Sequence, residues 1–132
     1  MSNATVRAVV AGHGDFATGM ISAVDQITGR GAVFAPMTNR DLSVDDITRN
    51  LESLIEHSGA AVVFTDLPAG SATVAARRVQ RTRPELIVVT AISLPVLLDF
   101  VFQGDLAAAD AARHAVEKGH GALAIVGPPG AR

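Results

Sequence analysis

A chain of 132 residues with 48% apolar side chains has the length and composition of one globular domain with a single core. Its formal net charge of −2 gives no general reason to expect nucleic-acid binding, and the absence of cysteine excludes disulfides, thiolate metal sites and a cysteine nucleophile. No apolar run approaches the roughly 20 residues of a membrane helix, and no signal-peptide pattern precedes the first apolar run. We therefore expect a single cytoplasmic domain over residues 1–132, in which residues 1–4 resemble a tag remnant.

The first half of the chain alternates short apolar runs with helical patterns. Residues 6–11 are rich in valine and are followed by a glycine, which is typical of a buried parallel strand. Apolar side chains at three- and four-residue spacings predict a helix over residues 16–28, and a second strand is expected at 32–36. Residues 41–59 predict the next helix, for which Ser43 is the expected N-cap.

The second half continues the alternation. Residues 60–66 are mostly apolar until they end in an aspartate, and residues 85–91 form the fourth apolar run, so both are expected strands. The remaining expected elements are helices at 72–82, 93–104 and 105–119 and a short final strand at 122–126. Repeated strand–helix units predict an α/β fold with a doubly wound, mostly parallel sheet in the order 2-1-3-4, to which the short C-terminal strand is added.

In a sheet of this kind, ligands bind beyond the carboxyl ends of the strands. That rule selects four short segments as the expected site, which are residues 12–14, 36–37, 66–68 and 91–93. Within the first segment, His13 stands between two glycines, which allow a tight backbone turn and leave the imidazole accessible to a large partner. His13 is therefore the first candidate for chemistry.

Other groups give His13 a chemical context. Asp66 ends the strand expected beside the first one, so its carboxylate can accept a hydrogen bond from one imidazole nitrogen and leave the other free as a nucleophile. Ser71 and the backbone amides at the start of the next helix can donate to phosphoryl oxygens. These groups predict a phosphohistidine site with His13 and Asp66 as catalytic residues, and with Gly14, Gly70 and Ser71 as phosphoryl-binding residues. Such a site requires no metal and no cofactor.

The tripeptide Gly-His-Gly returns at residues 119–121. His120 precedes the last expected strand, at its amino end and thus at the wrong end of the sheet for a ligand, so we expect it to be a turn residue. His57, near a helix C-terminus, and His114, in the middle of a helix, are not candidates for the site.

Simpler roles stay open for several of these side chains. Asp66 is also explained as a strand-end carboxylate that caps the following loop, and Ser71 as a plain N-cap. The apolar segment 94–102 is either core or interface. A basic cluster farther along is either a solvated helix face or a docking site for an acidic partner; it consists of Arg77, Arg78, Arg81 and Arg83.

Three segments carry a resemblance to a known family: "GHGDFATGM" (12–20), "VVFTDLPAGS" (62–71) and "AISLPVLLDF" (91–100). Over residues 6–126 the chain resembles the EIIA proteins of the mannose family of the bacterial phosphoenolpyruvate-dependent sugar phosphotransferase system. The resemblance implies that His13 is the phosphorylated histidine, that Asp66 orients it and that Ser71 supplies a hydroxyl group.

The resemblance also implies a function and partners. As a phosphocarrier, such a chain accepts a phosphoryl group from phospho-HPr on His13 and passes it to an EIIB partner for sugar uptake and phosphorylation. It reaches the membrane only indirectly, through an EIIC/EIID transporter. The resemblance further implies a homodimer, since proteins of the family are usually dimeric and have a last strand that can exchange between subunits; "ALAIV" (122–126) is the candidate for that strand.

The chain departs from the family pattern at four positions: Ala69 replaces a glycine, Ala72 a proline, Ser93 an asparagine and Val96 a methionine. The altered loop keeps a second interpretation open, in which the phosphorylation state of an EIIA-like module regulates a partner protein without carrying sugar phosphate flux. Binding of a free nucleotide or flavin is the weakest interpretation, because the chain has neither a glycine-rich phosphate loop nor an aromatic residue suited to cover a flavin ring.

Overall fold

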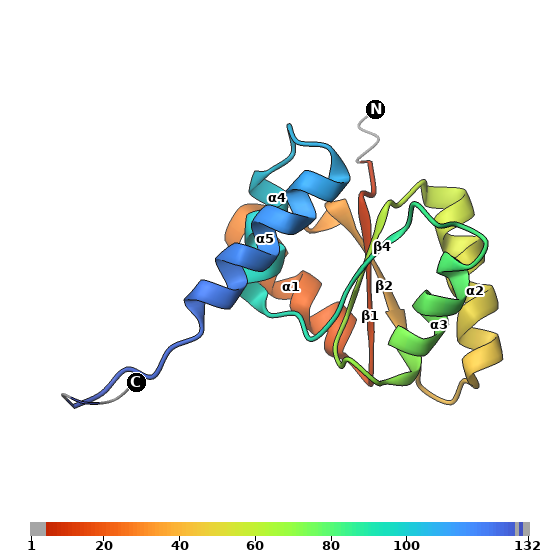
Figure 1. The fold of residues 1–132 in the computed structure, drawn as a ribbon, viewed down its shortest axis with the longest axis horizontal. Coiled ribbons are helices and arrows are strands. Elements are labelled where there is room, and N and C mark those ends of the chain that lie inside the picture. The colour runs from red at the N-terminus through yellow and green to blue at the C-terminus, as the bar shows by residue number, and fades with distance from the viewer. Residues whose placement is uncertain (1–4, 129, 131–132) are drawn as a thin grey trace.

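The computed structural model describes residues 5–128 and residue 130; the expected tag remnant at residues 1–4 lies outside the described residues, as do residues 129 and 131–132. Four parallel strands form a sheet in the order β2-β1-β3-β4 (Figure 1). Their bounds are Ala8–Gly12 (β1), Phe34–Thr38 (β2), Val62–Thr65 (β3) and Ile87–Val89 (β4). The α/β fold and the strand order expected from the sequence are confirmed.

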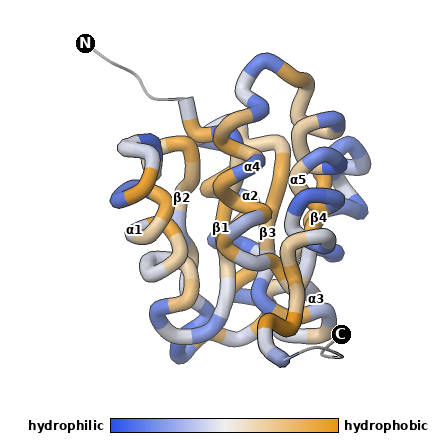
Figure 2. The backbone as a smooth tube through the Cα atoms, turned by 90° about the vertical axis from the view of Figure 1, so that its left-hand side faces the viewer, coloured by the Kyte–Doolittle hydropathy of each residue, from blue (hydrophilic) through white to orange (hydrophobic). Residues whose placement is uncertain are grey.

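Helices cover both faces of the sheet (Figure 1). One face carries α1 (Phe16–Thr28), α4 (Leu94–Phe102) and α5 (Ala108–Ala122), and the other carries α2 (Val44–Ser58) and α3 (Ser71–Gln80). The central strands β1 and β3 are buried along their whole length, which explains their continuous apolar runs. Figure 2 shows that hydrophilic residues lie mainly on the helices and loops around them. No helix within the described part of the chain has the length and apolar character that a bilayer crossing demands.

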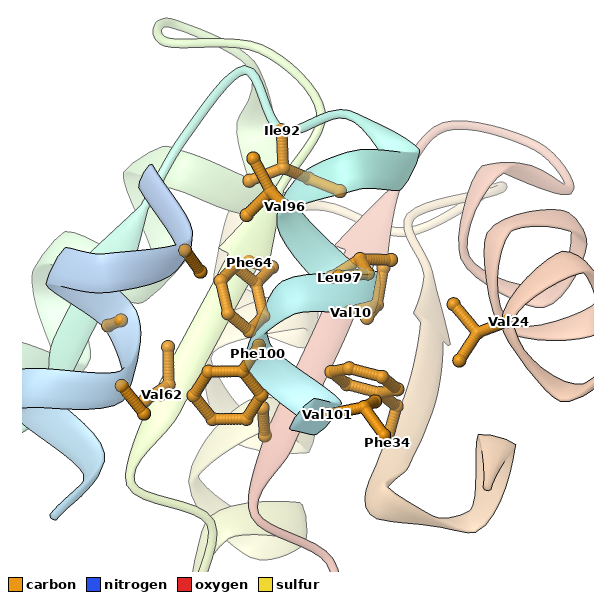
Figure 3. Close-up of a cluster of buried hydrophobic side chains, with 14 of the residues drawn as sticks. Val10, Val24, Phe34, Val62, Phe64, Ile92, Val96, Leu97, Phe100 and Val101 are labelled. Carbon is orange, nitrogen blue, oxygen red and sulfur yellow. The ribbon is translucent and has the colours of Figure 1, made fainter. Parts of the chain in front are cut away.

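Three phenylalanines join the sheet to α4. The rings of Phe34, Phe64 and Phe100 contact one another (Figure 3). The ring centroids are 5.1 Å apart for Phe64 and Phe100, 5.9 Å for Phe34 and Phe100, and 6.1 Å for Phe34 and Phe64. The guanidinium of Arg7 lies over the Phe100 ring, 5.0 Å from its centroid. Most of the apolar segment 94–102 is therefore core, although Phe102 at its end is 62% exposed.

The helix α2 begins and ends as the sequence predicts. The hydroxyl of Ser43 accepts a hydrogen bond from the backbone N–H of Asp46 at 3.1 Å, and the carboxylate of Asp46 accepts one from the backbone N–H of Ser43 at 3.3 Å. These reciprocal bonds form a capping box, which satisfies two N–H groups at the start of the helix. Gly59 ends the helix in the left-handed conformation, with φ of 75°.

The second strand begins two residues later than the sequence predicts. A short 3₁₀ turn (Gly31–Val33) follows α1, and the N–H of Gly31 donates to Asp25 Oδ1 at 3.0 Å. The turn contains the first residues of the apolar run, so β2 begins only at Phe34. The strand then continues to Thr38. The prediction that residues 36–37 follow the strand and border the site is wrong, because both residues lie inside β2. Asn39 and Arg40 follow the strand instead.

Residues 122–126 do not form the expected short strand within this chain. The helix α5 continues to Ala122, and the segment that follows leaves the sheet without pairing to it (Figure 1). Leu123, Ile125 and Val126 are 90%, 65% and 96% exposed. Among the described residues, β4 consequently has β3 as its one neighbour and is an edge of the sheet.

The second Gly-His-Gly tripeptide is helical, and the expected turn at His120 is wrong. His120 lies in the last turn of α5. A Cβ atom on Gly119 would overlap the side chain of Val96, so this glycine allows α5 to approach α4 closely. His120 also lines a groove of about 530 Å³ together with Val89 and Ser93, which places it near the carboxyl end of β4 and not at the amino end of a strand. The sequence-based interpretation failed because it took Gly119, which is required for packing against Val96, as the signal of a turn.

Candidate functional site

The carboxyl ends of β1 and β3 bring His13 and Asp66 together. These strands are parallel neighbours with Ala11 opposite Thr65, so the residues that follow them share one edge of the sheet, the lower edge in Figure 1. The Nδ1 atom of His13 lies 2.8 Å from Asp66 Oδ2, and the backbone N–H of His13 donates to the same oxygen at 2.9 Å. The structure thus contains the expected contact, on which the predicted roles of both side chains depend.

The two side chains differ in burial and in charge. The imidazole of His13 is 57% exposed, whereas the carboxylate of Asp66 is 10% exposed. Burial by itself raises the pKa of Asp66, but the hydrogen bonds from the backbone N–H and the imidazole of His13 together lower it by more, so its pKa lies below the usual value. When the imidazole is neutral, the ionised carboxylate favours the tautomer with the proton on Nδ1, which leaves the lone pair of the ring on Nε2. Nε2 can therefore act as the nucleophile.

Glycine at position 12 is required by the close approach of Asp66. A Cβ atom at Gly12 would lie 2.7 Å from Asp66 Cγ and 2.8 Å from a ring carbon of Phe16. On the other side of the histidine, Gly14 has φ of +52°, a conformation that glycine adopts without steric cost. The two glycines therefore have different functions: the first admits the carboxylate, and the second turns the chain into α1.

The N-terminus of α3 lies against the imidazole. A Cβ atom at Gly70 would lie 3.4 Å from His13 Cε1 and 3.8 Å from Asp66 Oδ1. Gly70 is the N-cap of α3 and has no side chain to bond the N–H groups of the first turn, which form the positive end of the helix dipole. An anion bound to Nε2 would thus meet backbone donors and a favourable potential. Among the described residues, Asp66 Oδ1 is buried without a hydrogen-bond partner.

Ser71 is the first residue of α3 and is not its N-cap, so the plain N-cap interpretation is wrong. Its hydroxyl oxygen accepts a hydrogen bond from the side-chain amide of Asn39 at 2.7 Å. The expected phosphoryl-binding residues Gly14, Gly70 and Ser71 all lie at the same end of the sheet as His13, beyond the strand ends.

Sequence reasoning missed the segment Thr38–Arg40, which follows β2 and borders the site. Thr38 Oγ1 donates to the carbonyl oxygen of Gly14 at 2.9 Å, and the backbone N–H of Asn39 donates to that of Gly12 at 3.1 Å. The guanidinium of Arg40 lies 3.3 Å from the carboxylate of Asp15 and partly offsets its charge beside the site. The displaced start of β2 concealed these residues. The polar triplet Thr-Asn-Arg after an apolar run was the signal that could have found them.

A buried chain of hydroxyl groups holds the loop between β3 and α3. Thr73 Oγ1 donates to the carbonyl oxygen of Leu67 at 2.5 Å, so the hydroxyl of Thr65, 2.6 Å away, is the donor to Thr73. Both threonines are at most 5% exposed. This chain of bonds fixes the path of residues 66–70, and Ala69 within it is exposed and forms part of the surface.

The other polar clusters have partners of their own. His114 Nδ1 lies 2.6 Å from Oδ2 of the buried Asp99, so α5 and α4 share a second imidazole–carboxylate pair. Both residues of this pair belong to helices, and neither follows a strand directly in the chain. In the basic cluster, Arg78 and Arg83 form ion pairs with acidic residues of α2, namely Asp45 and Glu56. In the part of the chain that the structure describes, no three histidine or acidic side chains converge as metal ligands.

Comparison with known proteins identifies the family. The family model described as "PTS system fructose IIA component" matches residues 7–117. The sorbose-specific EIIA component of the phosphotransferase system from Klebsiella pneumoniae is 32% identical over 112 residues, which are 83% of each chain. The chain therefore belongs to the mannose-type EIIA family of the phosphotransferase system, as its sequence motifs indicate. Proteins of this family take part in phosphoryl transfer.

Solved structures share the fold. The mannose/sorbose-specific IIA subunit of Enterococcus faecalis is similar with a TM-score of 0.80 at 20% identity, over 96% of this chain and 98% of that one. The EIIA component of Streptococcus agalactiae gives a TM-score of 0.81 at 16% identity, over 90% and 95% of the chains. A sigma-54 interaction domain protein of Enterococcus faecalis has the same fold, with a TM-score of 0.70 at 16% identity over 88% and 91%.

Proposed function

We propose that this chain is a phosphocarrier that accepts a phosphoryl group on His13 from phospho-HPr and passes it to an EIIB protein. The observation that carries the proposal is the contact of His13 Nδ1 with Asp66 at 2.8 Å, beside the N-terminus of α3. This contact fixes Nδ1 of the exposed imidazole and leaves Nε2 available to a partner protein. The altered loop at Ala69 is compatible with this role, because Ala69 is exposed and points no bulky group at the site.

The transfer is an in-line displacement between two histidines. The lone pair on Nε2 of His13 attacks the phosphorus, and the P–N bond of the donor breaks as its electron pair returns to the HPr imidazole. The proton on Nδ1 stays in its hydrogen bond to Asp66, whose negative charge stabilises the positive charge that develops on the ring. The amides of the first turn of α3 and the hydroxyl of Ser71 bind the phosphoryl oxygens. Positioning and electrostatics thus supply the catalysis.

The partners follow from the same proposal. An EIIB protein takes the phosphoryl group by the reverse displacement, and sugar phosphorylation then occurs at an EIIC/EIID transporter, which is this chain's indirect link to the membrane. The active form is a homodimer in which the segment 123–126 pairs with β4 of a second copy. Two observations support this assembly: the segment is apolar and exposed, and an apolar groove lined by Val89, Ile92 and Val96 lies beside the end of β4.

A regulatory module that carries no sugar phosphate flux is the second function considered from the sequence. The fold is compatible with it, since a sigma-54 interaction domain protein shares the same architecture. The carrier role is better supported, because the 32% identical relative is a sugar-specific EIIA component and because the imidazole–carboxylate pair is intact.

Phosphorylation with phosphoenolpyruvate, enzyme I and HPr tests the proposal. Intact mass and site mapping under alkaline conditions should find one acid-labile phosphoryl group on His13, and His13→Ala should remove it completely. His114→Ala is the matched control, because it removes the second imidazole held by a buried carboxylate. It should lower the free energy of unfolding by about 1–3 kcal/mol, because Asp99 loses its partner, and leave the phosphoryl group in place. A phosphoryl group that survives in His13→Ala would contradict the assignment.

A further inference from the structure

Asn39 connects the two halves of the site. Its backbone N–H donates to the carbonyl oxygen of Gly12 at 3.1 Å, directly before His13. Its side-chain Nδ2 donates to the hydroxyl oxygen of Ser71 at 2.7 Å, at the first residue of α3. The backbone of Asn39 is thus bonded to the residue before His13, and its side chain is bonded to the first residue of α3. It is half-buried, so this arrangement is partly shielded from water.

The direction of this hydrogen bond decides what the hydroxyl of Ser71 can do. A serine hydroxyl has one hydrogen to donate and two lone pairs with which to accept. The amide of Asn39 takes one lone pair and donates its own hydrogen, so the hydroxyl hydrogen of Ser71 stays available. Within residues 5–128, Ser71 Oγ takes part in no hydrogen bond as a donor. Among the described residues, this hydrogen is therefore free to bond an acceptor that a ligand supplies.

A phosphoryl group on His13 would supply that acceptor. Gly70, next to Ser71, approaches the His13 imidazole so closely that a Cβ atom there would lie 3.4 Å from Cε1. A hydrogen bond from a hydroxyl to a charged oxygen is stronger than one between neutral groups. The bond from Asn39 restricts the rotation of the Ser71 hydroxyl, so the hydroxyl loses less rotational freedom when it donates to an arriving group.

We propose that Asn39 is a positioning residue for phosphoryl transfer, which accepts no phosphoryl group itself but orients the hydroxyl of Ser71 as a donor to the group on His13. This inference rests on the proposed function. It assigns a role to a residue of the segment after β2, where sequence analysis expected the site residues two positions earlier.

The test is a double-mutant cycle on the rate of transfer from phospho-HPr, measured by quenched flow with the full chain. The variants are Asn39→Ala, Ser71→Ala and the double variant. Because one oriented hydrogen bond is lost in each case, both single variants should slow transfer about tenfold, and the double variant should be no slower than Ser71→Ala alone. Effects that multiply in the double variant would show that the two side chains act independently, and that result would overturn the inference.

Asn39→Asp gives an independent readout. A carboxylate at this position accepts the hydrogen of Ser71 and turns it away from the phosphoryl site, so this variant should transfer more slowly than Asn39→Ala. In the Ser71→Ala background, the difference in rate between Asn39→Asp and Asn39→Ala should mostly disappear. Thermal unfolding of each variant separates these effects from loss of structure. If wild-type His13 takes up no phosphoryl group, the proposed function fails. If it does and Asn39→Ala transfers at the wild-type rate, the role of Asn39 alone fails.

Discussion

Asp66 presents a single oxygen atom to His13, and that oxygen accepts from both the backbone N–H and the ring Nδ1, at 2.9 and 2.8 Å. The backbone bond fixes where the loop after β1 places the histidine, and the ring bond fixes the orientation and tautomer of the imidazole. One carboxylate oxygen therefore couples the path of the chain to the chemistry of the side chain.

Replacement of Asp66 by asparagine should slow phosphoryl acceptance by about 100-fold, because the amide no longer stabilises a positive charge on the ring and can force the wrong tautomer. Quenched-flow measurement of transfer from phospho-HPr gives the rate. Circular dichroism should show an intact fold, and a rate equal to that of the wild type would remove Asp66 from the mechanism.

Stability should respond to pH through the same carboxylate. The pKa of Asp66 in the folded chain is below its ordinary value of 3.8, so its ionised form stabilises the fold above that value, and this contribution is lost as the pH falls through the folded-state pKa. Urea unfolding should show Asp66→Asn to be less stable than the wild type at pH 7, by about 1–3 kcal/mol, with a smaller difference at pH 3. A difference that grows on acidification would contradict the assignment.

Substitution of Gly12 by alanine should disrupt the pair between His13 and Asp66. The added Cβ atom would lie 2.7 Å from Asp66 Cγ, so the carboxylate or the loop must move. We expect a loss of about 1–3 kcal/mol in the free energy of unfolding together with a strong decrease in the transfer rate.

Gly19→Ala is the control for that substitution. Gly19 lies within α1, and a Cβ atom there would meet nothing within 4 Å. It should stabilise the chain by about 0.5–1 kcal/mol and leave transfer unchanged. If Gly12→Ala behaved in the same way, the close approach of Asp66 would have no functional importance.

The exposed C-terminal segment should control assembly. In the proposed homodimer it covers β4 of a second copy, so Leu123→Asp combined with Ile125→Asp should convert dimers to monomers in sedimentation velocity. Both side chains are more than half exposed in the single chain, at 90% and 65%, so the fold of the monomer should survive. A wild-type chain that is monomeric at high concentration would contradict the proposed exchange.

The sheet and the contact between His13 and Asp66 could be predicted from the sequence for one physical reason. A parallel strand buried on both faces has to be apolar throughout, so its end is marked by the first polar residue or glycine. That rule located the end of β1 at Gly12 and of β3 just before Asp66. Neighbouring parallel strands then bring the following residues to the same edge.

The missed features depend on contacts that apolar periodicity does not reveal. The start of β2 is displaced by a turn in which Asp25 accepts a hydrogen bond from the backbone N–H of Gly31, six residues later. The need for glycine at position 119 comes from Val96 of α4, which α5 approaches closely there. Likewise, the hydrogen bond that the Ser71 hydroxyl accepts comes from Asn39, 32 residues away. Local periodicity contains no information about such partners.

The close contact between α5 and its neighbours has a consequence for motion. The buried face of α5 consists of small residues: Ala111, Ala112, Ala115 and Gly119. Small side chains permit a short distance between helices but remove little apolar area from water, so α5 gains less from burial than a helix that presents leucine or phenylalanine. Its amide hydrogens should therefore exchange through local opening, at a lower free energy than those of β1 and β3. The helix next to the exposed C-terminal segment can then open while the central strands, and with them the contact between His13 and Asp66, stay folded.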